Sequence, residues 1–135
     1  MSRQKDKAAL PKVGLFACAS GGSNTGALAA MAALEVVRRL GSDVMGICSL
    51  PATLNEVPRQ SALVKKMETI VVLDGCHQQC AKQLLEMIGI KPALYLNIEQ
   101  DLGIQKLGPF TSLRFTNEQV QAVTDALVTA IQSVL

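Results

Sequence analysis

Four short apolar runs along the chain have the length and composition of buried β-strands. They cover residues 12–17, 43–48, 68–73 and 93–98, and a proline, glycine or serine lies close to at least one end of each run. The third run reads Glu-Thr-Ile-Val-Val-Leu, which is β-branched and nearly continuous, as in a strand that is covered on both faces. We therefore predict four strands at these positions.

Helical patterns lie between the apolar runs. Residues 26–40 are rich in strong helix formers, place apolar side chains near helical spacing and stop at Gly41. Residues 76–89 have apolar side chains on one side of a helix, and residues 58–66 are expected to form a short helix. The stretch before it, from residue 49 to residue 57, shows no clear period and is expected to be a loop.

The C-terminal segment carries the clearest helical signal. Thr116 and Gln119 have the spacing of a capping box, and an apolar stripe at helical spacing follows, formed by Val120, Val123, Leu127, Ile131 and Val134. Residues 101–115 hold two glycines and a proline and are expected to be irregular.

Strands and helices alternate along the chain, which is typical of an α/β fold with a parallel sheet. Right-handed crossovers then give a three-layer, Rossmann-like domain, a four-stranded parallel sheet of order 2-1-3-4 with helices on both faces. We expect residues 12–135 to form this single domain and residues 1–11 to be a flexible basic N-terminal arm.

The composition of the chain argues against several classes of function. The 135 residues carry a net charge of only +2 and 3% aromatic residues, so we expect no nucleic-acid partner. Residues 13–34 lack charge, but the polar run at residues 20–26 interrupts them, so we expect no membrane span. The protein is expected to be cytoplasmic. Its 4 cysteines then stay reduced and suggest metal ligation or thiol chemistry.

The four cysteines follow predicted strands. Cys18 comes after the first strand, Cys48 ends the second, and Cys76 and Cys80 come after the third. In a parallel sheet, all four cysteines would lie at the edge formed by the carboxyl ends of the strands, where ligands bind. Four thiolates can close a tetrahedral Zn²⁺ site, whereas three would leave an exchangeable position. The alternative is that the cysteines are buried small hydrophobes.

The polar run after Cys18 lies where the first strand meets the first helix. Its residues are Ser20, Gly21, Gly22, Ser23, Asn24 and Thr25, followed by Gly26. Backbone N–H groups at such a helix start favour a small anion and can lower the pKa of Cys18. A tight turn, with Thr25 or Asn24 as the helix cap, explains the run equally well. No nucleotide-binding pattern is present, and Asn24 stands where a thiol phosphatase has arginine.

Three other polar residues are candidates for the site. His77, the only histidine, is expected to be exposed, with a role as a substitute ligand left open. Asp74 is expected to cap the helix that follows it rather than to orient a ligand. Asp101 is expected to be structural.

The runs at residues 18–26, 74–82 (Asp-Gly-Cys-His-Gln-Gln-Cys-Ala-Lys) and 101–104 resemble the DGC-domain family, which is named for its Asp-Gly-Cys triplet. The resemblance covers nearly the whole chain. That family is described as zinc-binding proteins with four characteristic cysteines, so the resemblance implies Zn²⁺ ligands at Cys18, Cys48, Cys76 and Cys80 and names no reaction. The family often has a Gly-rich loop after the second cysteine, where residues 50–57 here read Leu-Pro-Ala-Thr-Leu-Asn-Glu-Val.

These observations leave three hypotheses. The first is a metal-binding module with Zn²⁺ held by the cysteine cluster. The second is a thiol-dependent redox or sulfur-transfer enzyme, in which Cys18 is the nucleophile and Cys76 or Cys80 resolves the product. The third is an anion-binding partner module without chemistry of its own. The sequence is compatible with a homodimer as well as with a monomer.

Overall fold

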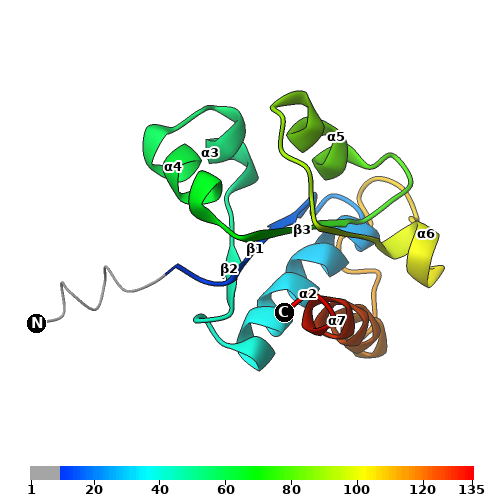
Figure 1. Cartoon of the computed structure of the whole chain (residues 1–135). Helices are drawn as coiled ribbons and strands as arrows, with labels where there is room; N and C mark the ends of the chain where they lie inside the picture. Colours follow the sequence, from blue (N-terminus) through cyan, green and yellow to red (C-terminus); the bar gives the residue numbers. More distant parts are fainter. Residues whose placement is uncertain (1–9) are drawn as a thin grey trace, which may run out of the picture.

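A computed structural model describes residues 10–135. Its sheet has four parallel strands in the order β2-β1-β3-β4, which confirms the predicted topology (Figure 1). The strands are β1 (Val13–Ala17), β2 (Met45–Ile47), β3 (Thr69–Asp74) and β4 (Leu94–Asn97). Of the predicted N-terminal arm, residues 1–9 lie outside the described part of the chain.

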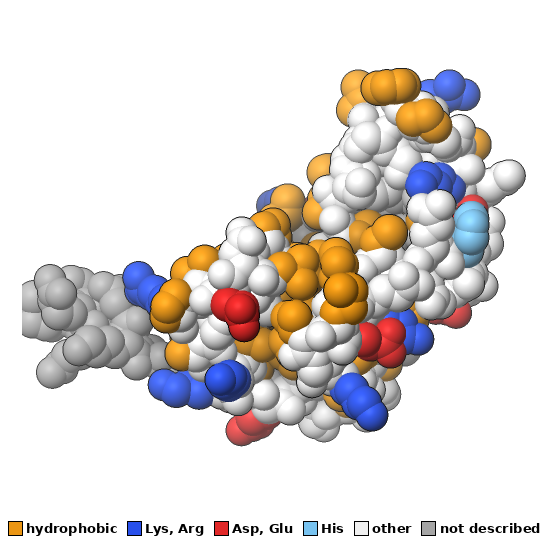
Figure 2. Space-filling view, turned by 90° about the horizontal axis from the view of Figure 1, so that it is seen from above, with side chains coloured by type: hydrophobic (Ala, Val, Ile, Leu, Met, Phe, Trp, Pro, Cys, Tyr) orange, Lys and Arg blue, Asp and Glu red, His pale blue; other side chains and the backbone are white. Residues whose placement is uncertain are grey.

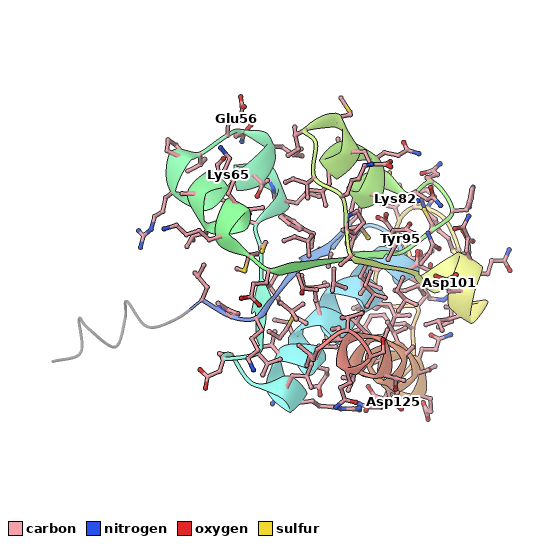
Figure 3. The ribbon with its side chains drawn as sticks, in the orientation of Figure 1. Glu56, Lys65, Lys82, Tyr95, Asp101 and Asp125 are labelled. Carbon is pink, nitrogen blue, oxygen red and sulfur yellow. The ribbon has the colours of Figure 1, made fainter. Side chains whose placement is uncertain are left out.

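Helices cover both faces of the sheet, which confirms the three layers (Figure 1). One face carries α2 (Asn24–Leu40) and α7 (Asn117–Gln132), where Arg39 pairs with Asp125, labelled in Figure 3. The other carries α3 (Leu50–Leu54), α4 (Pro58–Lys66) and α5 (Cys80–Met87). A short helix, α6 (Ile98–Leu102), follows β4 directly.

The two central strands are buried on both sides, as the continuous apolar runs predicted. Leu15 and Leu73 are fully buried against α2 and α7. Phe16 and Val72, which point to the opposite face, are fully buried in a second cluster that includes Leu85 of α5. The cores on the two faces fix the strand register and hold the carboxyl ends of β1 and β3 side by side.

The outer face of α3, α4 and α5 is seen in Figure 2, where hydrophobic side chains gather in the middle of the surface. A groove of about 600 Å³ lies on this side of the molecule, and its apolar lining includes Val64, Ile70, Ile88 and Ile90. No cysteine lines this groove, so it is separate from the sulfur-bearing edge of the sheet. Within residues 10–135, no helix combines the length and apolar character needed to cross a bilayer.

Three local predictions that concern the cysteine-bearing segments were wrong. The N-cap of α2 is Ser23, whose hydroxyl accepts the Gly26 N–H, and not Thr25 or Asn24. The loop expected after Cys48 contains α3, because Ser49 caps it by accepting the Ala52 N–H.

The third correction concerns the helix expected from residue 76. It begins four residues later, at Cys80, and residues 76–79 form a turn. Gln79, immediately before the helix, has a left-handed backbone (φ 57°), which stops the helix from extending backwards. Cys76 and Cys80 are therefore not one turn apart on a helix face.

Candidate functional site

A small pocket lies at the carboxyl edge of the sheet, between the ends of β1 and β3. This is the point where the winding direction of the sheet reverses, the usual ligand position in open α/β sheets. The pocket has a volume of about 100 Å³ and is lined by three of the four cysteines, Cys18, Cys76 and Cys80. All cysteines among residues 10–135 are free thiols, and Cys80 is the most exposed of these three.

Cys48 does not line this pocket, and instead lines a neighbouring hollow together with Cys18. It is 7% exposed and packs in the core cluster under α4 and α5. Its Sγ faces β1, because a Cβ atom placed on Gly14 would lie 2.9 Å from it. Burial raises the pKa of the Cys48 thiol to about 11. The structure thus brings three of the four predicted ligands to one pocket and leaves Cys48 outside it.

The sulfurs are not arranged as a finished metal site. Across residues 10–135, no three His, Cys, Asp or Glu side chains are grouped closely enough to hold a metal ion. The three pocket cysteines lie on separate segments: the end of β1, the turn after β3 and the start of α5. Metal binding would therefore require the three sulfurs to move closer together.

Close backbone contact joins the two cysteine-bearing segments. A Cβ atom on Gly75 would lie 2.9 Å from the backbone of Thr25, and one on Gly26 would lie 1.8 Å from the carbonyl oxygen of Ser20. Both positions therefore require glycine. Gly75 lets the turn after β3 contact the start of α2, and Gly26 lets the start of α2 pack against the segment that follows Cys18.

Two of the four non-glycine residues with positive φ in residues 10–135 lie directly beside cysteines. Ala19, directly after Cys18, has φ 46°, and Gln79, directly before Cys80, has φ 57°. L-residues without special local bonding rarely adopt these angles, and such strain is common at functional sites.

Burial dominates the chemistry of Cys18. Desolvation raises the pKa of its thiol, and the charges of Asp74 and Cys76 raise it further. Backbone N–H groups of Ser20 and Gly75 donate to the sulfur and lower the pKa, but by less than burial raises it. These two N–H groups belong to the segment before α2 and to the turn after β3, and burial outweighs their effect on the pKa. Cys18 is thus a protonated thiol at neutral pH.

Asp74 organises the turn after β3. Its side chain is 1% exposed and accepts the N–H groups of Ala81 (2.9 Å) and Lys82 (3.1 Å), so it caps α5 as expected. It also accepts the Tyr95 hydroxyl (3.0 Å), while the Lys82 ammonium lies 4.8 Å from the Tyr95 ring centre. Tyr95 and Lys82 are labelled beside each other in Figure 3.

Asp74→Ala is expected to lower the free energy of unfolding by about 1–3 kcal/mol, because it leaves buried donors without an acceptor. Urea unfolding of the variant measures this. Tyr95→Phe removes one of the three donors and should cost less. Equal costs for the two variants would contradict the capping role.

Asn97 holds the turn from the other side. It is fully buried at the end of β4, and its amide donates to the Cys76 carbonyl oxygen (2.7 Å) and to the Tyr95 hydroxyl (2.9 Å). Its backbone N–H donates to Asp101 (2.7 Å), which confirms a structural role for Asp101, labelled in Figure 3. Asn97 and Tyr95 were not predicted as site residues. Their polar side chains on an otherwise apolar strand were the available signal.

The polar run after Cys18 divides into two groups. Ser20, Ser23 and Thr25 line the pocket, whereas Gly21, Gly22 and Asn24 do not. Asn24 is buried and instead binds the loop after α6, accepting the Leu107 N–H (2.9 Å) and donating to the Gln105 carbonyl (3.0 Å).

The loop anchored by Asn24 brings Lys106 into the pocket. The Lys106 ammonium lies 3.8 Å from the sulfur of Cys76. Lys106 is 30 residues from Cys76 and over 80 from the polar run, in a segment without periodicity, so the sequence offers no signal for it.

His77 does not line the sulfur pocket. It is exposed, as expected, and its Nδ1 lies 2.6 Å from a Glu99 carboxylate oxygen. Glu99 also accepts the N–H groups of His77 (2.9 Å) and Lys106 (3.0 Å). These contacts, the Lys106 N–H first, lower the pKa of Glu99 to about 2. Glu99 therefore joins the turn after β3 to the loop that carries Lys106.

Stability is expected to depend on pH through Glu99. A carboxyl whose pKa is lowered to about 2 in the folded state stabilises the fold above its ordinary pKa of about 4.5, and this stabilisation disappears as pH falls toward 2. Glu99→Gln should be less stable than the parent at pH 7. The urea midpoints of the parent and of Glu99→Gln should converge as the pH is lowered from 7 to 2. A difference between the two midpoints that stays constant with pH would contradict the lowered pKa of Glu99.

Comparison with known proteins gives one match. The family model described as the DGC domain matches residues 14–127, a range that contains all four cysteines. Neither the comparison with curated proteins nor the comparison with solved structures gives a match.

Proposed function

The chain belongs to the DGC-domain family, and we propose from this and from the geometry of the site that it is a zinc-binding protein. The ligands are Cys18, Cys76 and Cys80. The observation that carries the proposal is the convergence of these three thiols, from three separate segments, on one pocket at the carboxyl edge of the sheet.

The donor set suits zinc. Thiolates are the ligands of many structural and exchangeable Zn²⁺ sites, and three of them leave one position open to water or another ligand. Three thiolates and one Zn²⁺ carry a single net negative charge, which the Lys106 ammonium beside Cys76 would offset. Bound zinc lowers the pKa of its thiol ligands, so the protonated state of Cys18 in the free protein does not prevent ligation.

Cys48 is left out of the proposed ligand set. Its thiol is buried among apolar side chains, and with a pKa of about 11 it is costly to ionise. Ligation by all four cysteines would require Cys48 to leave the core and turn from Gly14 toward the pocket. The chain therefore offers a matched control, a cysteine at the same edge of the sheet that does not line the pocket.

The zinc content of four single variants tests the proposal. Protein is purified under reducing conditions, loaded with Zn²⁺, desalted and analysed by mass spectrometry. Cys18→Ser, Cys76→Ser and Cys80→Ser should each lose bound zinc, and Cys48→Ser should retain it. Zinc loss in all four variants would instead establish the four-cysteine site, and equal zinc retention in all four would overturn zinc binding at this pocket.

Thiol chemistry is the second candidate function, because two backbone N–H groups donate to Cys18 as they would to a nucleophilic thiolate. The raised pKa of Cys18 argues against it in the metal-free protein. A nucleophilic Cys18 would react with iodoacetamide near pH 7 faster than an ordinary thiol, whereas the zinc proposal expects slow alkylation that zinc suppresses further. Either function needs reduced cysteines, so we place the protein in a reducing compartment such as the cytoplasm.

A further inference from the structure

Thr25 is a buried hydroxyl without a partner. Its side chain is 1% exposed at the second position of α2 and lines the sulfur pocket. It is the one residue, within the part of the chain that the structure describes, whose buried side-chain oxygen has no hydrogen-bond partner. Buried polar groups are nearly always paired, so an unpaired hydroxyl on a residue that lines a pocket points to a ligand that would pair with it.

Two positive features face the same pocket. The N-terminus of α2, a helix of 17 residues, carries the positive end of the helix dipole. The Lys106 ammonium lines the pocket from the opposite segment and is held there by the bonds of its loop to Asn24 and Glu99. The hydroxyls of Ser20 and Ser23 also line the pocket and can donate to an acceptor.

We propose that the pocket binds a small tetrahedral oxyanion, such as phosphate or sulfate, between the Thr25 hydroxyl and the Lys106 ammonium at the N-terminus of α2. The site does not require bound metal, so it goes beyond the proposed zinc function. A volume of about 100 Å³ has room for one such ion.

The other charges around the pocket are compatible with an anion. Asp74 also lines the pocket, but its carboxylate already accepts three hydrogen bonds, from Ala81, Lys82 and Tyr95. Cys18, whose pKa is raised by burial, is an uncharged thiol in the metal-free protein. A ligand that accepts the Thr25 hydroxyl would satisfy the one unpaired group.

Calorimetric titration of reduced, metal-free protein with inorganic phosphate and sulfate tests this proposal. Saturable binding of one ion per chain is expected. Lys106→Gln should weaken it about tenfold, the loss expected for one charge-assisted hydrogen bond. Lys91→Gln removes the same charge from an exposed position before β4 and should leave binding unchanged. Absence of saturable binding to the parent protein would overturn the proposal.

Thr25→Val separates a binding role from a structural one. The change keeps the branched shape and removes the unpaired hydroxyl, so the ligand-free variant should unfold at a higher urea concentration than the parent. The same variant should bind phosphate more weakly. A variant that loses stability, or that binds phosphate as tightly as the parent, would contradict the assignment of Thr25.

A second titration distinguishes the source of the anion. If the natural ligand is a free ion, inorganic phosphate should bind more tightly than phenyl phosphate, because the ester bond removes one of the oxygens that can accept a strong hydrogen bond. If phenyl phosphate binds more tightly, the ligand is a phosphate group on a larger molecule. Both results support an oxyanion site, whereas failure of both ligands to bind overturns it. Neither result depends on the outcome of the zinc experiments.

Discussion

Gly26→Ala is expected to destabilise the protein by more than about 3 kcal/mol, the upper end of the range for overpacking. A Cβ atom at this position would lie 1.8 Å from the backbone carbonyl oxygen of Ser20. Neither group can rotate away, since one is attached to the first turn of α2 and the other is main chain. The segment after Cys18 must therefore move away from the helix.

The same substitution should lower zinc content. Moving the Ser20 backbone displaces the N–H group that donates to Cys18 and changes the position of its sulfur. Urea unfolding and metal analysis of one preparation measure both effects. Gly21→Ala is the matched control, because no atom lies within 4 Å of a Cβ at that position, and it should change stability by less than about 1 kcal/mol. Equal stability of the two variants would contradict the close contact.

Leu73→Ala is expected to cost about 2–5 kcal/mol in the free energy of unfolding, because it removes a fully buried side chain and leaves a cavity. Leu73 lies in β3, pairs with Ala17 in β1, and its carbonyl accepts the Cys18 N–H (3.0 Å). Denaturant unfolding of mutant and parent gives the value. Ile47→Ala, at a 45% exposed position on the edge strand β2, should cost clearly less. A Leu73→Ala cost below about 1 kcal/mol would mean that β3 is not central.

Much of the fold follows from local patterns. The order of the strands was predictable because four apolar runs alternate with helical segments and right-handed crossovers restrict the topologies. Residues 58–66 formed the predicted short helix, and the capping box of Thr116 and Gln119 is present at the start of α7. Each of these features depends on residues that are close in the sequence.

The start of α5 was not predictable in this way. Residues 76–79 have the composition of a helix, but their backbone groups bind distant partners: Asn97 binds the carbonyl of Cys76, and Glu99 binds the N–H of His77. Gln79 then takes a left-handed conformation that no local signal indicates. Tertiary hydrogen bonds overrode helix propensity here, and they moved Cys76 off the helix.

The candidate site was only partly predictable, because tertiary contacts rather than local sequence place some of its residues. Strand ends placed Cys18, Cys76 and Cys80 at one edge, which required only the topology. Whether Cys48 shares their pocket depends on side-chain direction at the end of an edge strand, which the sequence does not specify. Lys106 enters the pocket only because Asn24 binds the loop after α6, a contact across more than 80 residues.

The coordination of bound zinc is the most direct test of the proposed function. X-ray absorption at the zinc edge, on protein loaded with one equivalent of Zn²⁺, should show three sulfur atoms at about 2.3 Å and one lighter oxygen or nitrogen ligand. The spectrum of Cys48→Ser should be the same. A shell of four sulfurs that loses one in Cys48→Ser, or a shell without sulfur, would contradict the three-cysteine zinc site.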